Sequence, residues 1–295
     1  MSDVDDQVAR GARVQRLDGQ FRWPGGRHVA VVVNVAYEAW SDGVAPGVGP
    51  MGNPLPARVL DTNAISWGHY GATRGIQRLL DILQRTNVRA SIMVSGVLAT
   101  RTPDVLAAMA NAGHDIVAHS LAQDILPAGL SAEKDAENIQ HTTSLLAGAS
   151  GIQPTGWISP RGTPGANTAR HLVDAGYLWQ GDVFDDDRPY LQLFDQARLV
   201  AIPLTMEIND LPHAMRFGRS PRQFIDAFDD QLASALSHER DAMIIDVTAH
   251  AHVYGRPAGA WAFEEIIRKL RARDDVWVAT RAEMAQHVIA SNPTT

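Results

Sequence analysis

The stretch VAVVVNV at residues 29–35 is almost entirely apolar and rich in β-branched side chains. The stretch MIIDVT at residues 243–248 has the same character. A strand that is apolar on both faces is typical of a parallel sheet with both faces covered. The two stretches therefore predict buried parallel strands near the two ends of the chain.

The rest of the chain alternates between short β-rich stretches and longer amphipathic ones. Further strands are predicted at residues 90–95, 115–119, 156–159, 178–182, 199–203 and 276–280. Helices are predicted at residues 73–84, 103–111, 132–146, 167–175, 221–236, 260–273 and 281–290. Repeated strand–helix order implies parallel strands with right-handed crossovers. Such a series favours a closed α/β barrel, which leaves no sheet edge, and a doubly wound open sheet is the alternative.

Composition narrows the class of protein. The 295 residues are 45% hydrophobic, which suits one domain over residues 1–295, with residues 1–26 as an N-terminal extension. The net charge of −7 and the lack of Lys/Arg-rich runs argue against a nucleic-acid partner. With no cysteine, disulfides, thiol nucleophiles and Cys-based metal sites are excluded. The acidic N-terminus and the lack of an apolar run of about 18 residues predict a cytoplasmic protein without a membrane segment.

One long irregular stretch follows the first strand, at residues 40–67, and includes SDGVAPGVGPMGNPL at residues 41–55. A loop of this length at that place is expected to act as a lid over a ligand. Packing on the barrel mouth without contacting the ligand is the alternative. Met51 and Asn53 in this stretch are candidate substrate contacts.

Polar side chains recur where the predicted strands end. Ligands of parallel α/β folds bind at the carboxyl ends of the strands. A carboxylate, imidazoles and a cation lie at those ends, which is the set that hydrolysis needs for proton transfer and oxyanion stabilisation. No GxSxG, GxGxxG or GxxxxGK[ST] motif is present, which argues against a serine nucleophile and a nucleotide cofactor.

Four segments in this order carry a resemblance to a known family. They are GHDIVAHS (113–120), GWISPRGTPGANTARHLVDAGYLWQGDVFDDDRP (156–189), IPLTMEIND (202–210) and AHAHVYGRP (249–257). The chain resembles the polysaccharide deacetylase (NodB-homology) family, and within it an allantoinase-like branch. The resemblance implies a distorted (β/α)7-type barrel that hydrolyses a carbon–nitrogen amide bond. It also implies a homo-oligomer, as is frequent in that branch.

The resemblance assigns roles to a carboxylate and a histidine, with two departures. The first family motif is an aspartate pair of base and metal ligand, and here only Glu38 offers a carboxylate, with a register ambiguous by two residues. The second motif, His-Ser/Thr-x-x-His, keeps His119 and Ser120 but has Gln123 in place of the second histidine. Glu38 and His119 are thus candidate ligands of one divalent metal, zinc first. A metal-free site is equally open, because an amide is a poor zinc ligand.

The remaining candidates come from the later motifs. His250 matches the late histidine that the family uses as general acid, and His252 lies on the same face of the strand end. Arg161 corresponds to an arginine that pairs with the base carboxylate, with a surface arginine as the alternative. Substrate contacts are predicted for Trp157, which is otherwise core, and for Tyr37, Glu207 and His252.

Three hypotheses follow. The first is a hydrolase of a small, cyclic amide, imide or ureide, in which Glu38 activates water and His250 protonates the leaving nitrogen. The second is an N-deacetylase of acetylated sugars. The third is a catalytically inactive barrel that binds a small ligand.

Overall fold

The computed structural model of the protein describes residues 11–52, 55–56 and 58–292. The strands are β1 Arg13–Arg16, β2 Val29–Tyr37, β3 Ser91–Val94, β4 Asp115–Ala118, β5 Gly156–Trp157, β6 Trp179–Gln180, β7 Tyr190–Phe194, β8 Ala197–Ala201, β9 Met243–His250 and β10 Trp277–Val278. The α-helices are α2 Thr62–Tyr70, α3 Ile76–Thr86, α4 Leu98–Arg101, α5 Pro103–Asn111, α6 Ala132–Ser150, α7 Thr168–Asp174, α8 Pro221–His238, α9 Pro257–Arg271 and α10 Arg281–Ser291. Short helical turns are η1 Pro24–Gly26, η2 Gly71–Gly75, η3 Pro127–Gly129, η4 Pro160–Gly162 and η5 Leu211–Arg216.

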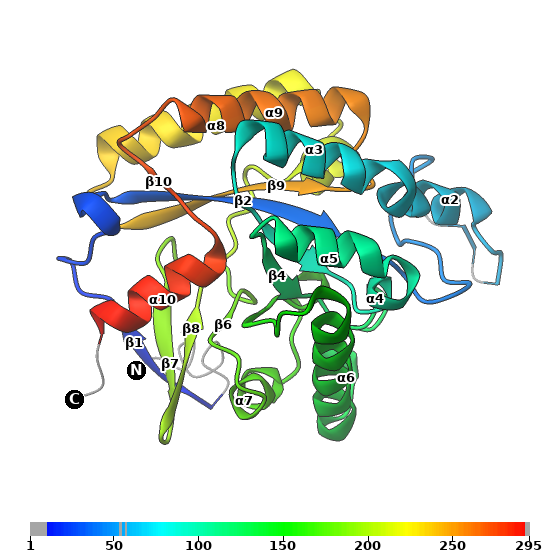
Figure 1. Ribbon diagram of the computed structural model, residues 1–295, viewed down its shortest axis with the longest axis horizontal. Helices are drawn as coiled ribbons and strands as arrows, with labels where there is room; N and C mark the ends of the chain where they lie inside the picture. The colour runs from blue at the N-terminus through cyan, green and yellow to red at the C-terminus, as the bar shows by residue number, and fades with distance from the viewer. Residues whose placement is uncertain (1–10, 53–54, 57, 293–295) are drawn as a thin grey trace.

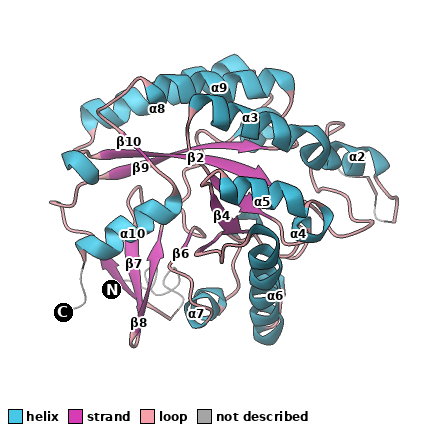
Figure 2. Ribbon diagram, in the orientation of Figure 1, coloured by secondary structure: helices cyan, strands magenta, loops and turns pink. Residues whose placement is uncertain are grey.

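The parallel strands follow the order β9-β2-β3-β4-β5-β6-β8, and the helices pack around the outside of the sheet (Figures 1 and 2). β10 pairs in parallel with the first half of β2, and β7 and β1 extend the sheet antiparallel beyond β8. Residues 205–210 run beside β9, where Asn209 and Thr248 form a parallel bridge. This irregular segment stands in for a regular strand beside β9, which makes the barrel a distorted one.

The predicted α/β barrel is confirmed, and each of the eight predicted strands overlaps an observed one. Two strands and two α-helices, α2 and α4, were not predicted. β1 and β7 are short antiparallel strands whose charged and polar residues weaken the apolar signal. The helix α2 begins at Thr62, inside the stretch expected to be irregular, and its N-terminus is capped by the Asp61 side chain. Its apolar residues are few, so its period is hard to read in the sequence.

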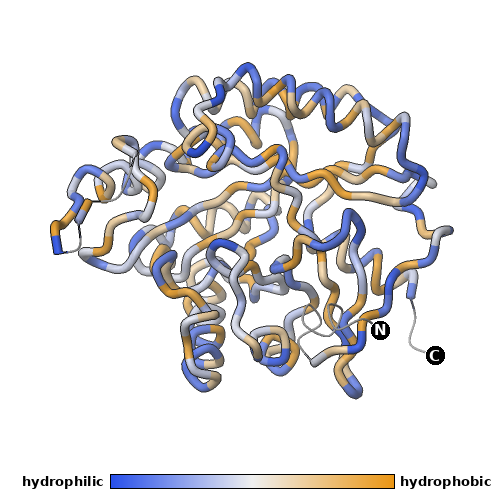
Figure 3. The backbone as a smooth tube through the Cα atoms, turned by 180° about the vertical axis from the view of Figure 1, so that it is seen from behind, coloured by the Kyte–Doolittle hydropathy of each residue, from blue (hydrophilic) through white to orange (hydrophobic). Residues whose placement is uncertain are grey.

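The strict alternation of β2 decides which side chains face the barrel interior. Val31, Val33 and Tyr37 belong to the core between the sheet and the helices, whereas Val32 and Ala36 belong to the interior core. Side chains of a strand alternate between its two faces, so even-numbered positions of β2 point inward. The chain is most hydrophobic along these central strands, and the outer helices carry hydrophilic stretches (Figure 3).

A buried polar group crosses the barrel interior below the carboxyl ends of the strands. The Arg281 guanidinium, fully buried, forms an ion pair of 2.6 Å with Asp246 of β9 and donates to the carbonyl oxygens of Ile202 and Pro203. Asn34 of β2 donates to the same carboxylate. These bonds tie α10 from inside to the segment that follows β8 and to the middle of β9. No described helix has the length and apolar character needed to cross a bilayer.

Candidate active site

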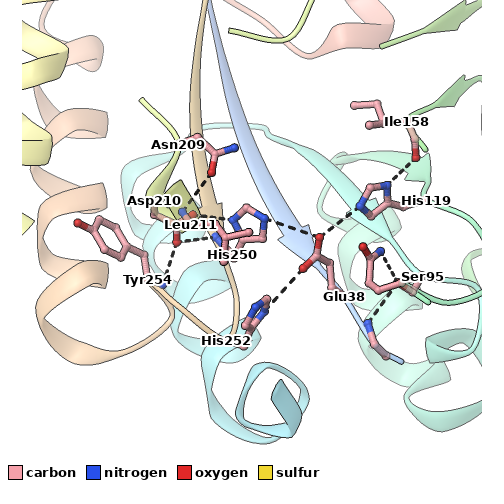
Figure 4. Close-up of polar contacts among 12 residues, drawn as sticks. Glu38, Ser95, His119, Ile158, Asn209, Asp210, Leu211, His250, His252 and Tyr254 are labelled. Atoms are coloured by element: carbon pink, nitrogen blue, oxygen red, sulfur yellow. Dashed lines mark hydrogen bonds and ion pairs between the residues drawn. The ribbon is translucent and has the colours of Figure 1, made fainter. Parts of the chain in front are cut away.

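Glu38 follows the last residue of β2, and its even position points its side chain into the mouth of the barrel. The carboxylate is only 10% exposed and is surrounded by three imidazoles (Figure 4). Its Oε1 atom lies 3.3 Å from His119 Nε2 and 3.7 Å from His250 Nε2, and its Oε2 atom lies 3.8 Å from His252 Nδ1. Four residues from distant parts of the chain therefore converge on one point.

His119 follows β4, in phase with the interior residue Val117, so its ring also points inward. Its Nδ1 atom donates to the Ile158 carbonyl oxygen at 2.5 Å, which turns Nε2 toward Glu38. The next residue, Ser120, has a positive φ of 59°, and its buried hydroxyl bonds to Asn138 of α6. That contact fixes the sharp turn in the chain immediately after the histidine.

His250 ends β9 and is held by Asp210. The Asp210 carboxylate accepts from His250 Nδ1 at 2.6 Å and from the His250 backbone at 2.8 Å. It also accepts from the Tyr254 backbone at 3.0 Å, so three donors fix one fully buried side chain. The Nδ1 proton is thereby fixed on the Asp210 side of the ring, and Nε2 faces Glu38.

His252 closes the site on a third side. Its ring packs edge-on against Trp67, with centroids 4.7 Å apart, and against Trp40 at 5.5 Å. The turn that carries it lies directly against η2. A Cβ atom at Gly75 would lie 1.8 Å from the Ala251 carbonyl oxygen, so only glycine permits this approach.

Mutual interactions fix the charges of the site. Burial alone would raise the pKa of Glu38, but the positive charge of His250, a hydrogen bond from His119 and the charge of His252 lower it to about 2. Burial alone would lower the pKa of His250, but Asp210 and Glu38 raise it to about 9. Burial lowers the pKa of His252 to about 4. At neutral pH the site therefore holds a carboxylate, an imidazolium and a neutral imidazole.

Comparisons with known proteins agree with this geometry. A family profile described as polysaccharide deacetylase matches residues 68–179. A Schizosaccharomyces pombe protein assigned to the polysaccharide deacetylases is 27% identical over 264 residues, which cover 81% of each chain. The resemblance to the polysaccharide deacetylase family is confirmed. The expectation of a hydrolase acting on carbon–nitrogen bonds other than peptide bonds is confirmed with it.

Solved structures support the same polysaccharide deacetylase fold. The crystal structure of a Pseudomonas aeruginosa protein assigned to this family has a TM-score of 0.81 and 27% identity, covering 92% of this chain and 95% of that one. The crystal structure of the allantoinase PuuE has a TM-score of 0.81 and 24% identity, covering 98% of each chain. The second likeness extends to the fold alone.

The divalent metal that the polysaccharide deacetylase family implies does not fit the residues present. Gln123 stands where the third ligand is expected, and its amide donates to the Ser95 hydroxyl at 3.1 Å. Amide groups are poor zinc ligands. Within residues 11–52, 55–56 and 58–292, no group of three or more His, Cys, Asp or Glu side chains is arranged to hold a metal ion.

Several predicted substrate contacts lie elsewhere. Tyr37 is fully buried in the helix-side core, where its hydroxyl bonds to Thr102 at 2.9 Å, because its odd position in β2 points away from the barrel interior. Trp157 is buried in the same core for the same reason, one residue out of phase with the interior residue Ile158. Tyr37 was therefore wrongly predicted as a substrate contact, whereas Trp157 follows the alternative of a core residue.

The other predicted residues are exposed or lie outside the described chain. Arg161 is exposed in η4 with a positive φ of 59°, and it forms no ion pair with Glu38, whose side-chain partners among the described residues are the three histidines. The expected pairing is therefore corrected. Glu207 is exposed and Met51 is 83% exposed, and neither contacts the three histidines in the described chain. Asn53 lies outside the described residues.

The sequence analysis did not place Asp210 and Trp67 in the site. Asp210 directly precedes η5 but makes no side-chain cap bond there. The segment 205–210 has no strand pattern, so its parallel course beside β9 could not be predicted from the sequence. Trp67 was assigned to a loop, although it lies on α2, whose pattern is weak.

Proposed function

We propose that the protein hydrolyses the carbon–nitrogen bond of a small, cyclic amide, imide or ureide by attack of an activated water. The observation that carries this proposal is the pair of opposite charges at the barrel mouth. A Glu38 carboxylate oxygen and His250 Nε2 lie 3.7 Å apart, with the imidazolium held from behind by Asp210. A base and an acid at this spacing can both reach the two ends of one scissile bond.

The reaction begins with a water that donates a hydrogen bond to Glu38. Its oxygen attacks the amide carbon as the proton moves to the carboxylate, which leaves a negative charge on the former carbonyl oxygen. When that tetrahedral species collapses, the carbon–nitrogen bond breaks and the nitrogen takes the Nε2 proton of His250. General acid–base catalysis of this kind contributes about 10²–10⁴-fold.

The two proton transfers reinforce each other. The negative charge of Glu38 is one cause of the high pKa of His250. Once Glu38 has accepted the water proton, that charge is gone, so His250 releases its proton more readily. A catalytically inactive barrel would have no need of this charge arrangement, which disfavours the third hypothesis.

The N-deacetylation of acetylated sugars is the second candidate, because the relatives are assigned to the polysaccharide deacetylases. The same Glu38 and His250 would serve, since an acetamide also contains a carbon–nitrogen amide bond. A lid at residues 40–67, as predicted from the sequence, would favour a small substrate, and Pro50 of this stretch lines the cavity next to the site. The lid, the homo-oligomer and the cytoplasmic location stay predictions.

The test is a substrate screen with matched variants. Allantoin, hydantoin, succinimide and N-acetylated chito-oligosaccharides are incubated with the wild type, with Glu38→Gln and with Glu137→Gln. Glu137 is exposed on α6, away from the site, and serves as the control. We expect turnover of a cyclic compound, a loss of about 10²-fold or more in Glu38→Gln, and no loss in the control. Acetate release without cyclic-amide turnover would favour the second candidate, and equal turnover by Glu38→Gln would contradict the mechanism.

A further inference from the structure

A cavity of about 560 Å³ opens beside the imidazole cluster. Its lining comes from the irregular segment before α2, from α2 and from the turn before α9, and consists of Pro50, Asn63, Ser66, Trp67, Tyr70 and Arg256. Trp67 joins it to the active site, because its ring also contacts His252, whose Nδ1 faces Glu38. The cavity is thus one imidazole ring away from the catalytic carboxylate.

Among the described residues of this lining, Arg256 alone carries a charge. Its Nε atom donates to the His252 carbonyl oxygen at 3.3 Å, and no acidic partner pairs with its guanidinium among the described residues. The N–H groups at the end of the guanidinium are therefore free to bind a ligand. A half-buried charge without a counterion is unfavourable, which implies that the ligand supplies the missing negative charge.

The orientation of Arg256 is fixed before any ligand binds. Its guanidinium carbon lies 4.1 Å from the centre of the Tyr70 ring, a close cation–π contact. The Tyr70 hydroxyl is held in turn by the Arg78 side chain at 2.8 Å, and Arg78 also donates to the Gly255 carbonyl oxygen. A guanidinium held over a ring in this way is pre-oriented, and its fork of N–H groups suits a bidentate carboxylate.

We infer that this cavity is a carboxylate-binding subsite, and that the natural substrate is a small amide or ureide that carries a carboxylate. The substrate class rests on the proposed function, whereas the subsite itself does not. The carboxylate would bind Arg256, the apolar body of the ligand would lie against Trp67, and Asn63 and Ser66 offer further polar contacts. The hydrolysed bond would then lie toward Glu38, on the other side of His252.

The test compares two ligands that differ by a carboxylate. Hydantoin-5-acetate and hydantoin are titrated by calorimetry into the non-hydrolysing Glu38→Gln protein, and then into the same protein with Arg256→Gln or Arg222→Gln added. Arg222 is the matched control, since it is also stacked on an aromatic ring, that of Trp261 at 5.4 Å, on the exposed surface. Hydrogen bonds to charged groups predict that hydantoin-5-acetate binds roughly tenfold to hundredfold more tightly than hydantoin. Arg256→Gln removes this preference and Arg222→Gln keeps it.

Two results would overturn the inference. One is a protein with Arg256 intact that shows no preference for hydantoin-5-acetate, including one that binds neither compound. The other is a preference that survives Arg256→Gln. Turnover by the wild type is measured separately: an Arg256-dependent preference without hydrolysis leaves the subsite standing and contradicts the proposed function. Hydrolysis of hydantoin without an Arg256-dependent preference would support the proposed function and contradict the subsite.

Discussion

Replacing Asp210 by Asn is expected to move the alkaline limit of activity toward neutral pH. His250 must be an imidazolium to protonate the leaving nitrogen, and Asp210 is the largest of the interactions that raise its pKa to about 9. The asparagine oxygen can still accept from the backbone of His250 and Tyr254, so the local fold is kept. Its amide group, however, donates toward Nδ1, which favours a neutral ring with the proton on Nε2.

The magnitude follows from the pKa values. Without Asp210, only the charge of Glu38 opposes the lowering of the His250 pKa by burial. That pKa is therefore expected to fall from about 9 toward its ordinary value of 6.5 or below. Each unit of pKa corresponds to about 1.4 kcal/mol, so the loss of imidazolium stabilisation is about 3.5 kcal/mol or more. In the wild type kcat/KM is expected to stay level through neutral pH and to fall above about 9, because Glu38 is ionised throughout. In Asp210→Asn it is expected to fall from about pH 6.5 upward.

The assay measures kcat/KM for the best substrate of the screen, because this parameter reports the ionisation of the free enzyme. The pH series spans the expected alkaline limits of both the wild type and Asp210→Asn. Asp135→Asn is the control, since Asp135 is also buried and hydrogen-bonded, to Thr168 on the far side of α6. That variant can lose stability without moving the pH limit. An Asp210→Asn enzyme with the wild-type alkaline limit would refute the assignment of His250 as the acid.

Two further predictions concern metal and the barrel interior. Dialysis against a chelator is expected to leave activity unchanged, because Gln123 does not replace the missing ligand; a loss that zinc restores would contradict this account. Arg281→Met is expected to lower the free energy of unfolding by about 3–5 kcal/mol in urea titrations, because it leaves the Asp246 carboxylate buried without its counterion. The control Arg268→Met removes an exposed pair with Glu264 and should cost less than about 1 kcal/mol. Equal losses in the two variants would refute a special role for the interior pair.

Apolar patterning was enough to predict the barrel, because its strands are buried on both faces and carry a strong signal. The same alternation, applied residue by residue, places Glu38 inside and Tyr37 outside. Counting in steps of two along β2 would therefore have removed Tyr37 from the candidate list. The same count along β5 removes Trp157. These candidates were chosen because they lie at strand ends, without regard to the alternation by which successive side chains point to opposite faces of the sheet.

Other features of the site could not be predicted from the sequence pattern. Asp210 lies 40 residues before His250, on a segment with neither a helical nor a strand period, so only the coordinates bring the two together. The predicted pairing of Arg161 with Glu38 was wrong for a different reason. Its motif placed it correctly near the barrel mouth, but a left-handed backbone conformation accompanies an exposed side chain. Conformations of this kind depend on the whole turn and leave little trace in the type of one residue.

Glu38 with a pKa of about 2 is a weak base when considered alone, and His250 with a pKa of about 9 is a weak acid. The difficulty disappears when the two are treated as one titrating unit, because each owes part of its shift to the charge of the other. A substrate that enters between them and separates their charges weakens both shifts, which makes the carboxylate more basic and the imidazolium more acidic. Exclusion of water by the bound ligand strengthens both changes. The substrate thus brings the pKa values of Glu38 and His250 closer together, which makes both proton transfers easier than in the free enzyme.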